Sequence, residues 1–350
     1  MSREYPFEIK KMGVGGILDN TIKIYRSNFL TIMLISLIFY GSYQIVSAIL
    51  ANTFGLGTNL ADLLNQSYSF FGDPDFLNDP QFFLDSLIAS PVYTDLVRSS
   101  IYVVLVTSVL SLFLVPYYNG AVTRTAIGYY RGEKNTVGGW IASMGKNYGR
   151  LLLLSICAFL FSVLIVLGFI VAVMILSLVI GLLISSAGVF GTVVGVLLII
   201  GLVFFVVVLA IAFSAAVQMT YAVAAAEDVW YFSAFLRAMK LCFSKLWKTA
   251  GNIFVISLIY GMISVVLQIV PTILGYANVW LSSMTSIVIS CLVLPLFTIS
   301  IAMLYIDLRI DREGYDLELR AEAAPDADSE DNGLGSEPTE GGADNGGFPL

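Results

Sequence analysis

The sequence predicts an all-α, polytopic membrane protein with six transmembrane helices, and two observations lead to this fold class. First, the chain is 58% hydrophobic and only 12% charged, whereas soluble domains carry roughly 25% charged residues. Second, neither Leu151–Ala226 nor Thr249–Ile306 contains an Asp, Glu, Lys or Arg. About 20 apolar residues suffice for a helix to cross a bilayer, and backbone groups in hydrocarbon must be hydrogen-bonded within the segment. These runs therefore predict transmembrane helices.

Six apolar runs account for the hydropathy of the chain. They cover about residues 29–51, 98–120, 151–184, 190–226, 249–274 and 282–307. The third and fourth runs are longer than one straight crossing at about 1.5 Å of rise per residue. Tilt, or helix that extends beyond the bilayer, explains their length better than two further crossings, because the short break at 185–188 leaves room for one turn only.

The positions of the basic residues predict the orientation in the membrane. All but one of the 18 Lys and Arg residues lie before the first span, in alternate loops or after the last span, and Arg98 is the exception. The loop at 52–97 contains six Asp and no basic residue. By the positive-inside rule, both termini are cytoplasmic and the acidic loop lies outside the cell membrane.

The charge pattern also divides the chain into three parts. Residues 1–28 form a cytoplasmic segment with an amphipathic interfacial helix, and residues 29–320 form the six-span membrane domain. Residues 321–350 are acidic, rich in Gly and Pro, and nearly free of large apolar side chains. Such a composition cannot bury enough apolar surface to fold, so this tail is predicted to be disordered.

Each cytoplasmic stretch that precedes an outward-going span has an amphipathic pattern ending in a basic and aromatic patch. The pattern predicts up to three repeats of an interfacial helix followed by a transmembrane hairpin, with rings in the interface and cations near anionic phospholipid headgroups. The residues predicted to contact lipid are Lys23, Tyr25, Arg26, Lys146, Tyr148, Arg150, Arg237, Lys240, Lys245, Trp247 and Lys248. Ordinary positive-inside anchoring explains the same charges equally well.

Catalytic, metal and cofactor sites are not predicted. The chain has no His, and its three Cys are far apart in apolar or amphipathic segments, which excludes His-based triads and a disulfide framework. No ionisable residue lies deep in a predicted span, which argues against ion-coupled transport. The polar candidates inside the spans are Gln44, Gln218 and Gln268. We expect a non-enzymatic protein whose partner is the lipid bilayer and not nucleic acid.

Two segments carry a family resemblance. Near the N-terminus, residues 16–19 read Gly-Ile-Leu-Asp and residues 24–29 read Ile-Tyr-Arg-Ser-Asn-Phe, and after the last span residues 305–317 read Tyr-Ile-Asp-Leu-Arg-Ile-Asp-Arg-Glu-Gly-Tyr-Asp-Leu. The chain resembles the membrane domain attached to some glycerophosphoryl diester phosphodiesterases, a family of mostly stand-alone multi-pass proteins of unknown function. Its acidic tail is typical of a haloarchaeal member. The chain departs from the family pattern at Asp311, where a basic residue is usual.

The resemblance implies no phosphodiesterase activity, because members with that activity carry it on a separate domain with catalytic histidines. Read physically, the terminal motif extends the last helix beyond the membrane, with i,i+4 ion pairs and a glycine that ends the helix. Structural capping is the favoured interpretation, and binding of a partner or headgroup is the alternative. The motif residues are Tyr305, Asp307, Arg309, Glu313, Gly314 and Asp316.

The function favoured by the sequence is that of a membrane scaffold or lipid-associated protein. The alternative is a transporter or permease for an uncharged or amphipathic solute. A polar cavity at mid-membrane lined by the three glutamines would favour transport, whereas a cleft open sideways to lipid would favour engagement of lipid.

Overall fold

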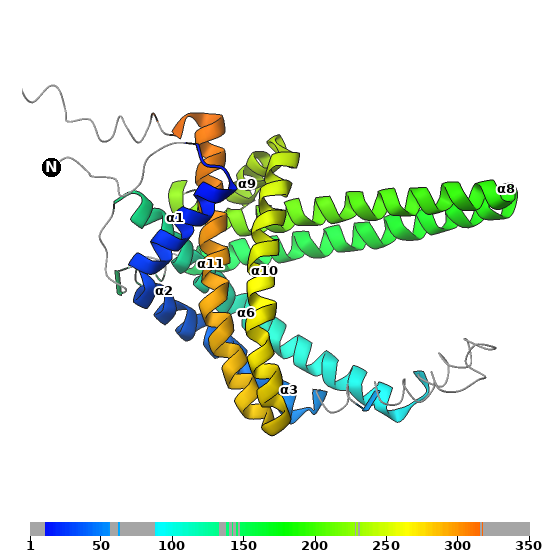
Figure 1. The fold of residues 1–350 in the computed structure, drawn as a ribbon, viewed down its shortest axis with the longest axis horizontal. Helices are drawn as coiled ribbons and strands as arrows, with labels where there is room; N and C mark the ends of the chain where they lie inside the picture. The colour runs from blue at the N-terminus through cyan, green and yellow to red at the C-terminus, as the bar shows by residue number, and fades with distance from the viewer. Residues whose placement is uncertain are drawn as a thin grey trace, which may run out of the picture.

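The computed structural model describes residues 11–56, 62–63, 88–132, 138–139, 142, 145, 148–227, 229, 232–315 and 317. Within these ranges every regular element is a helix, which confirms the all-α prediction (Figure 1). The predicted disordered tail and most of the predicted acidic loop lie outside the described residues.

The N-terminal part forms an amphipathic helix followed by an apolar rod. Its elements are α1 (Val14–Ser27), α2 (Phe29–Ile35), the π-helix η1 (Ser36–Gly41) and α3 (Ser42–Thr53). Ile17, Thr21 and Ile24 are fully buried, because their spacing of three to four residues places them on one face of α1. Asn28 interrupts the helix before the apolar rod begins.

Helix α6 (Pro91–Tyr130) begins earlier than the predicted span at 98. The Ser90 hydroxyl accepts a hydrogen bond from the Tyr93 amide at 3.2 Å, and Pro91 occupies the first helical turn, which together form a standard helix start. The acidic loop therefore ends at residue 90 and not at 97. The second half of α6 is buried, and small residues such as Gly120 and Ala121 allow close packing there.

Helix α8 (Tyr148–Glu227) covers the predicted spans 151–184 and 190–226. The segment folds back on itself, because the Tyr221 side chain lies next to that of Ser155. A straight helix with about 1.5 Å of rise per residue would hold these two residues about 100 Å apart. Figure 1 shows α8 as two rods side by side that project from the bundle.

The C-terminal part contains a short helix and a long helical hairpin. Its elements are α9 (Phe232–Ser244), α10 (Leu246–Ala277) and α11 (Val279–Glu313). Asn278 makes the turn between α10 and α11, and its side chain caps α11 by accepting from the amides of Trp280 at 2.8 Å and Leu281 at 3.3 Å. The two long helices make the most extensive contact between elements in the described bundle.

Five helices of the described part are long and apolar enough to cross a membrane. They are Phe29–Thr53, Pro91–Tyr130, Phe204–Glu227, Leu246–Ala277 and Val279–Glu313. Of the predicted span at 151–184, the stretch Tyr148–Leu160 of α8 counts as a shorter apolar helix among the fully described residues. The membrane class is therefore confirmed, while the sixth span and the threefold repeat stay predictions.

One end of the bundle gathers the charged residues. Helices α1 and α9 and the last turns of α11 lie together there, and the turn between α10 and α11 lies at the opposite end (Figure 1). We call this region the charged end. The core beneath it includes Tyr118, Tyr130 and Met219, all nearly inaccessible to solvent.

Candidate functional site at the charged end

The last turns of α11 present two polar faces to the surrounding helices. Residues 305, 309 and 313 follow one another at intervals of four and share one face, and Asp307 and Asp311 share another. Each face meets ionic partners from other helices, so that two neighbouring ionic clusters surround the end of α11. Their residues come from segments far apart in the sequence.

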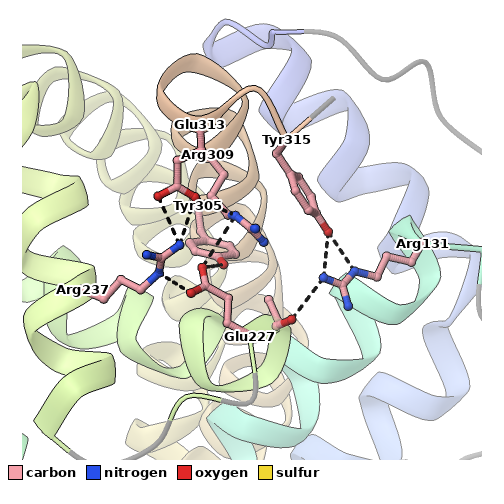
Figure 2. Close-up of polar contacts among 8 residues, drawn as sticks. Arg131, Glu227, Arg237, Tyr305, Arg309, Glu313 and Tyr315 are labelled. Atoms are coloured by element: carbon pink, nitrogen blue, oxygen red, sulfur yellow. Dashed lines mark hydrogen bonds and ion pairs between the residues drawn. The ribbon is translucent and has the colours of Figure 1, made fainter. Parts of the chain in front are cut away.

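Glu227, at the end of α8, is the centre of the first cluster (Figure 2). The Tyr305 hydroxyl donates to the Glu227 Oε1 at 2.6 Å, and the Arg309 Nε lies 3.6 Å from the same oxygen. Arg237 of α9 also pairs with Glu227. Glu313 completes the cluster, since its Oε2 accepts from Arg237 at 3.0 Å and from Arg309 at 3.1 Å. Three helices are thereby joined by alternating charges.

Tyr315 connects this cluster to α6. Gly314 ends α11 with a left-handed φ of 65°, a conformation that glycine adopts without steric cost. The chain then places the Tyr315 hydroxyl where it accepts from Arg131 at 2.8 and 2.9 Å. The Arg309 guanidinium lies 3.9 Å from the centre of the Tyr315 ring, a favourable cation–π contact. Arg131 also donates to the carbonyl of Ala226 at 3.1 Å.

The second cluster joins α11 to α10 and to the segment before α1. Asp307 is fully buried and accepts from the Met12 amide at 2.7 Å and from Lys248 at 3.0 Å. Asp311 pairs with Lys11 at 2.5 Å, with Lys248 at 3.4 Å and with Lys245. Two carboxylates thus receive three lysines and one backbone amide.

Asp311 lies beyond the apolar part of α11 and Lys11 precedes α1, and the pairing shifts the pKa of both groups. Hydrogen bonds from Lys11 and Lys245 hold the pKa of Asp311 well below its ordinary value of 3.8. The same hydrogen bond raises the pKa of Lys11, and the negative charge of Asp311 adds to this effect. A lowered carboxylate pKa stabilises the fold above pH 3.8, and the stabilisation is lost as the pH falls below that value.

The arrangement is suited to holding helices together. Each acidic side chain in the two clusters faces at least one cation, and the exposed fraction of the Glu227, Asp307 and Asp311 side chains is 10% or less. Such pairs are strongly destabilised when one partner is removed, because the other charge stays buried. No group of three or more Cys, Asp or Glu suited to a metal ion occurs among the residues that the structure describes.

The terminal motif predicted from the sequence lies at the centre of this site. Tyr305, Asp307, Arg309 and Glu313 all contribute to the clusters, and the predicted pair Arg309–Glu313 is present at 3.1 Å. Gly314 ends the helix as expected. Asp316 lies outside the described residues.

Tyr305 lies inside the bundle and not on its surface. It is only 1% exposed, because its hydroxyl is bonded to Glu227 inside the bundle. The resemblance noted from the sequence would place a basic residue at position 311, and the acid found there pairs with Lys11, Lys245 and Lys248.

The predicted lipid contacts fall into different environments. Arg237, Lys245 and Lys248 point to the carboxylates of α11. Tyr25 and Tyr148 tie helices together, since their hydroxyls donate to the carbonyls of Leu292 at 3.0 Å and Phe113 at 3.1 Å. The exposed ones are Lys23, Arg26, Arg150, Lys240 and Trp247. Lys146 lies outside the described residues.

Helix α9 has two apolar faces. Its inner face, which includes Ala234, Phe235 and Ala238, is buried. The outward face, continued by the first turn of α10, carries large apolar side chains around one lysine. Its residues and exposed fractions are Phe232 (47%), Leu236 (49%), Phe243 (37%) and Trp247 (69%), with Lys240 also exposed. At about 100° per residue Phe232, Leu236, Lys240 and Phe243 fall within one arc of α9, and Trp247 follows in the first turn of α10.

The intramembrane glutamines bond to neighbouring side chains. Gln44 donates to the Tyr40 hydroxyl at 3.0 Å, and Gln268 accepts from Ser286 at 3.1 Å. Gln218 is half-buried on α8. Gln268 lines a shallow cleft of about 420 Å³ with Ser264 and Thr272.

Comparison with known proteins gives no match to a family model, to a curated protein or to a solved structure. The fold itself therefore defines the class: the chain is an all-α membrane protein with several apolar helices of spanning length. The resemblance to the membrane domain of glycerophosphoryl diester phosphodiesterases stays a prediction.

Proposed function

We propose that the protein is a lipid-associated membrane scaffold that holds α9 in the headgroup layer on the cytoplasmic side. The observation that carries this proposal is the outward face of α9, where Phe232, Leu236 and Phe243 surround Lys240 and lead to Trp247. Aromatic side chains at the edge of a bilayer favour the membrane–water interface. The aliphatic part of the Lys240 side chain covers apolar surface while its ammonium group reaches a lipid phosphate.

Ion pairs at the charged end fix the rotation of α9 about its axis, and with it the direction in which its outward face points. Arg237 pairs with Glu227 and Glu313, and it lies on the side of α9 between the buried and the exposed apolar face. Rotation of α9 about its axis would break both pairs and move Phe235 out of the core. The outward face is consequently presented to the surroundings at all times, as expected of a surface that contacts lipid.

Helix α1 and the first residue of α2 present a related surface. Ile22 is 43% exposed and Phe29 is 40% exposed, with Lys23 and Arg26 exposed beside them. The buried Asp307, bonded to the Met12 amide, holds the start of α1 against α11. Two amphipathic helices at the same end then offer cations to anionic phospholipid, worth about 1 kcal/mol each near the surface.

The alternative function, a permease for an uncharged solute, is less well supported. A path for solute would have to open at the charged end, where two ionic clusters join the helices. Removing a buried carboxylate from its cation costs about 3–5 kcal/mol, and opening would separate several such pairs at once.

The test is retention of anionic lipid by the purified protein. The parent is extracted into native-lipid nanodiscs, and bound lipid is measured by mass spectrometry against the bulk membrane. We expect enrichment of anionic phospholipid, reduced about five-fold by Arg26→Gln and again by Lys240→Gln, since each charge contributes about 1 kcal/mol. Arg98→Gln, the same charge change at the opposite end of the bundle, is the matched control.

Two results would contradict the proposal. One is a parent protein whose co-purified lipid has the composition of the bulk membrane. The other is an equal loss of anionic lipid in Arg98→Gln, because that would make the effect one of net charge and not of a defined surface.

A further inference from the structure

A cleft of about 330 Å³ lies between η1, α10 and α11. Its wall is formed mainly by hydroxyl-bearing and aromatic side chains. They include Tyr40, Ser257, Tyr260, Ser264, Ser290 and Phe297, and Gly261 lies among them. None of these lining residues belongs to the charged end.

The cleft lies in the apolar middle of the bundle. Ser257 and Ser264 both belong to the middle third of α10, and their spacing of seven residues places them on one face. Ser290 reaches the cleft from the opposite helix of the α10–α11 hairpin. The adjoining outer side of α10 is apolar and exposed, as at Met262 and Val265. A ligand would therefore enter from the hydrocarbon layer.

The serine hydroxyls of this cleft lack partners. Ser257, Ser264 and Ser290 make no hydrogen bond among the residues that the structure describes. Other serines of the bundle have hydrogen-bonded hydroxyls. Ser36 and Ser300, for example, donate to the carbonyl four residues earlier at 2.8 and 2.9 Å. Ser257 is exposed on the surface of the bundle and Ser264 and Ser290 are half-buried. An unpaired hydroxyl that faces hydrocarbon is costly. Three such groups facing one cleft indicate a polar ligand.

Tyr40 adds a directed donor. It belongs to the π-helix η1, and single π-turns within helices occur frequently at functional sites. Gln44 donates to the Tyr40 hydroxyl at 3.0 Å, so the oxygen acts as acceptor there and its own proton is available to the cleft. Donors of this kind match acceptor oxygens on a ligand.

The lining also limits the charge and shape of the ligand. No acidic or basic residue belongs to the described lining, and a charged ligand would have no counter-ion. Phe297 and Tyr260 form an edge-to-face pair with ring centres 6.5 Å apart, which offers aromatic surface to a flat head. Gly261 leaves space, because an added Cβ would meet nothing within 4 Å.

We propose that this cleft binds a neutral, lipid-soluble molecule whose head is a carbonyl-bearing ring, the chemistry of a prenyl quinone. The serine and tyrosine hydroxyls donate to the carbonyl oxygens, the aromatic pair contacts the ring, and the isoprenoid chain lies along the apolar side of α10. The proposal concerns binding only and is independent of the lipid surface on α9.

The test uses the full chain in nanodiscs and a decyl benzoquinone that carries a photoreactive azide. Irradiation labels α10 and α11 peptides in the parent, and an excess of plain decyl benzoquinone suppresses the labelling. Gly261→Leu fills the cleft and reduces labelling at least ten-fold. Gly251→Leu is the matched control, since it adds the same side chain to α10 at another open position and leaves labelling unchanged.

A second variant distinguishes the contribution of the hydrogen-bond donors from that of the cleft volume. Ser257→Ala with Ser264→Ala removes two donors and keeps the volume, so labelling falls about five-fold for each hydrogen bond of about 1 kcal/mol. Labelling that plain quinone does not suppress, or that Gly261→Leu and Gly251→Leu affect equally, overturns the proposal and indicates simple partition into lipid.

Discussion

Replacing Glu227 by glutamine changes the first ionic cluster at its centre while the size of the side chain is kept. The Glu227 side chain is 10% exposed and pairs with Arg237 and Arg309, and it accepts a hydrogen bond from Tyr305 at 2.6 Å. A glutamine oxygen still accepts from Tyr305. The two guanidinium groups, however, keep Glu313 as their only acid in this cluster.

The expected loss in the free energy of unfolding follows from how deeply the ion pairs are buried. Loss of one partner from a fully buried ion pair costs about 3–5 kcal/mol. Here the Arg237 side chain is 37% exposed and Glu313 is 33% exposed, so solvent and the remaining acid screen part of the loss. We expect the free energy of unfolding to fall by about 2–3 kcal/mol. Adding Arg237→Gln removes one of the uncompensated cations and should restore about 1 kcal/mol.

The assay is denaturation of the purified protein by SDS in mixed micelles, followed by circular dichroism. Lys240→Gln is the matched control: it removes an exposed charge from the same helix α9, and its effect should stay below about 0.5 kcal/mol. If Glu227→Gln unfolds within 0.5 kcal/mol of the parent, the buried cluster does not contribute to stability, and the reasoning is refuted.

Three further predictions concern the rest of the charged end. Asp311→Asn should speed hydrogen exchange at the Met12 amide relative to the parent at the same, neutral pH. This difference should shrink only as the pH falls well below 3.8, because the lysine hydrogen bonds hold the pKa of Asp311 below that value. Gly314→Ala should cost about 1–2 kcal/mol in SDS denaturation because of its φ of 65°, whereas Gly251→Ala should be neutral or stabilising. In a variant with Trp247 as the sole tryptophan, iodide should quench fluorescence from the cytoplasmic side of oriented proteoliposomes only, and quenching from outside would contradict the topology.

The parts of the fold that could be predicted from the sequence are local. Uncharged runs and helical periodicity predict apolar rods and the amphipathic α1, because both depend on neighbours along the chain. The pair Arg309–Glu313 and the helix end at Gly314 were predicted for the same reason. The predicted start of α6 was late, since Ser90 and Pro91 form a capping signal within a segment interpreted as loop.

The partners in the ionic clusters could not be predicted, because they are distant in sequence. Met12 and Asp307 are 295 residues apart, and Glu227 and Tyr305 are 78 apart. A usable signal was nevertheless present: acids and bases recur every four residues on two sides of the end of α11, so partners are needed on both sides. The positive-inside rule assigns Lys245 and Lys248 to the cytoplasmic side but cannot distinguish a headgroup from a carboxylate as their partner.

The two apolar faces of α9 indicate what the ionic clusters do: they determine which face packs against the bundle. A helix with an inner face of Ala234 and Phe235 and an outer face of Leu236 and Phe243 could pack through either one, because hydrophobic burial is not directional. Arg237 lies between the faces, and its pairs with α8 and α11 are satisfied in one rotation only. Ion pairs of this kind often add little to stability while specifying one arrangement. Arg237→Met should accordingly keep the helical content but let the environment of Trp247 vary. A single unchanged Trp247 emission maximum and lifetime in that variant would show that packing alone orients α9.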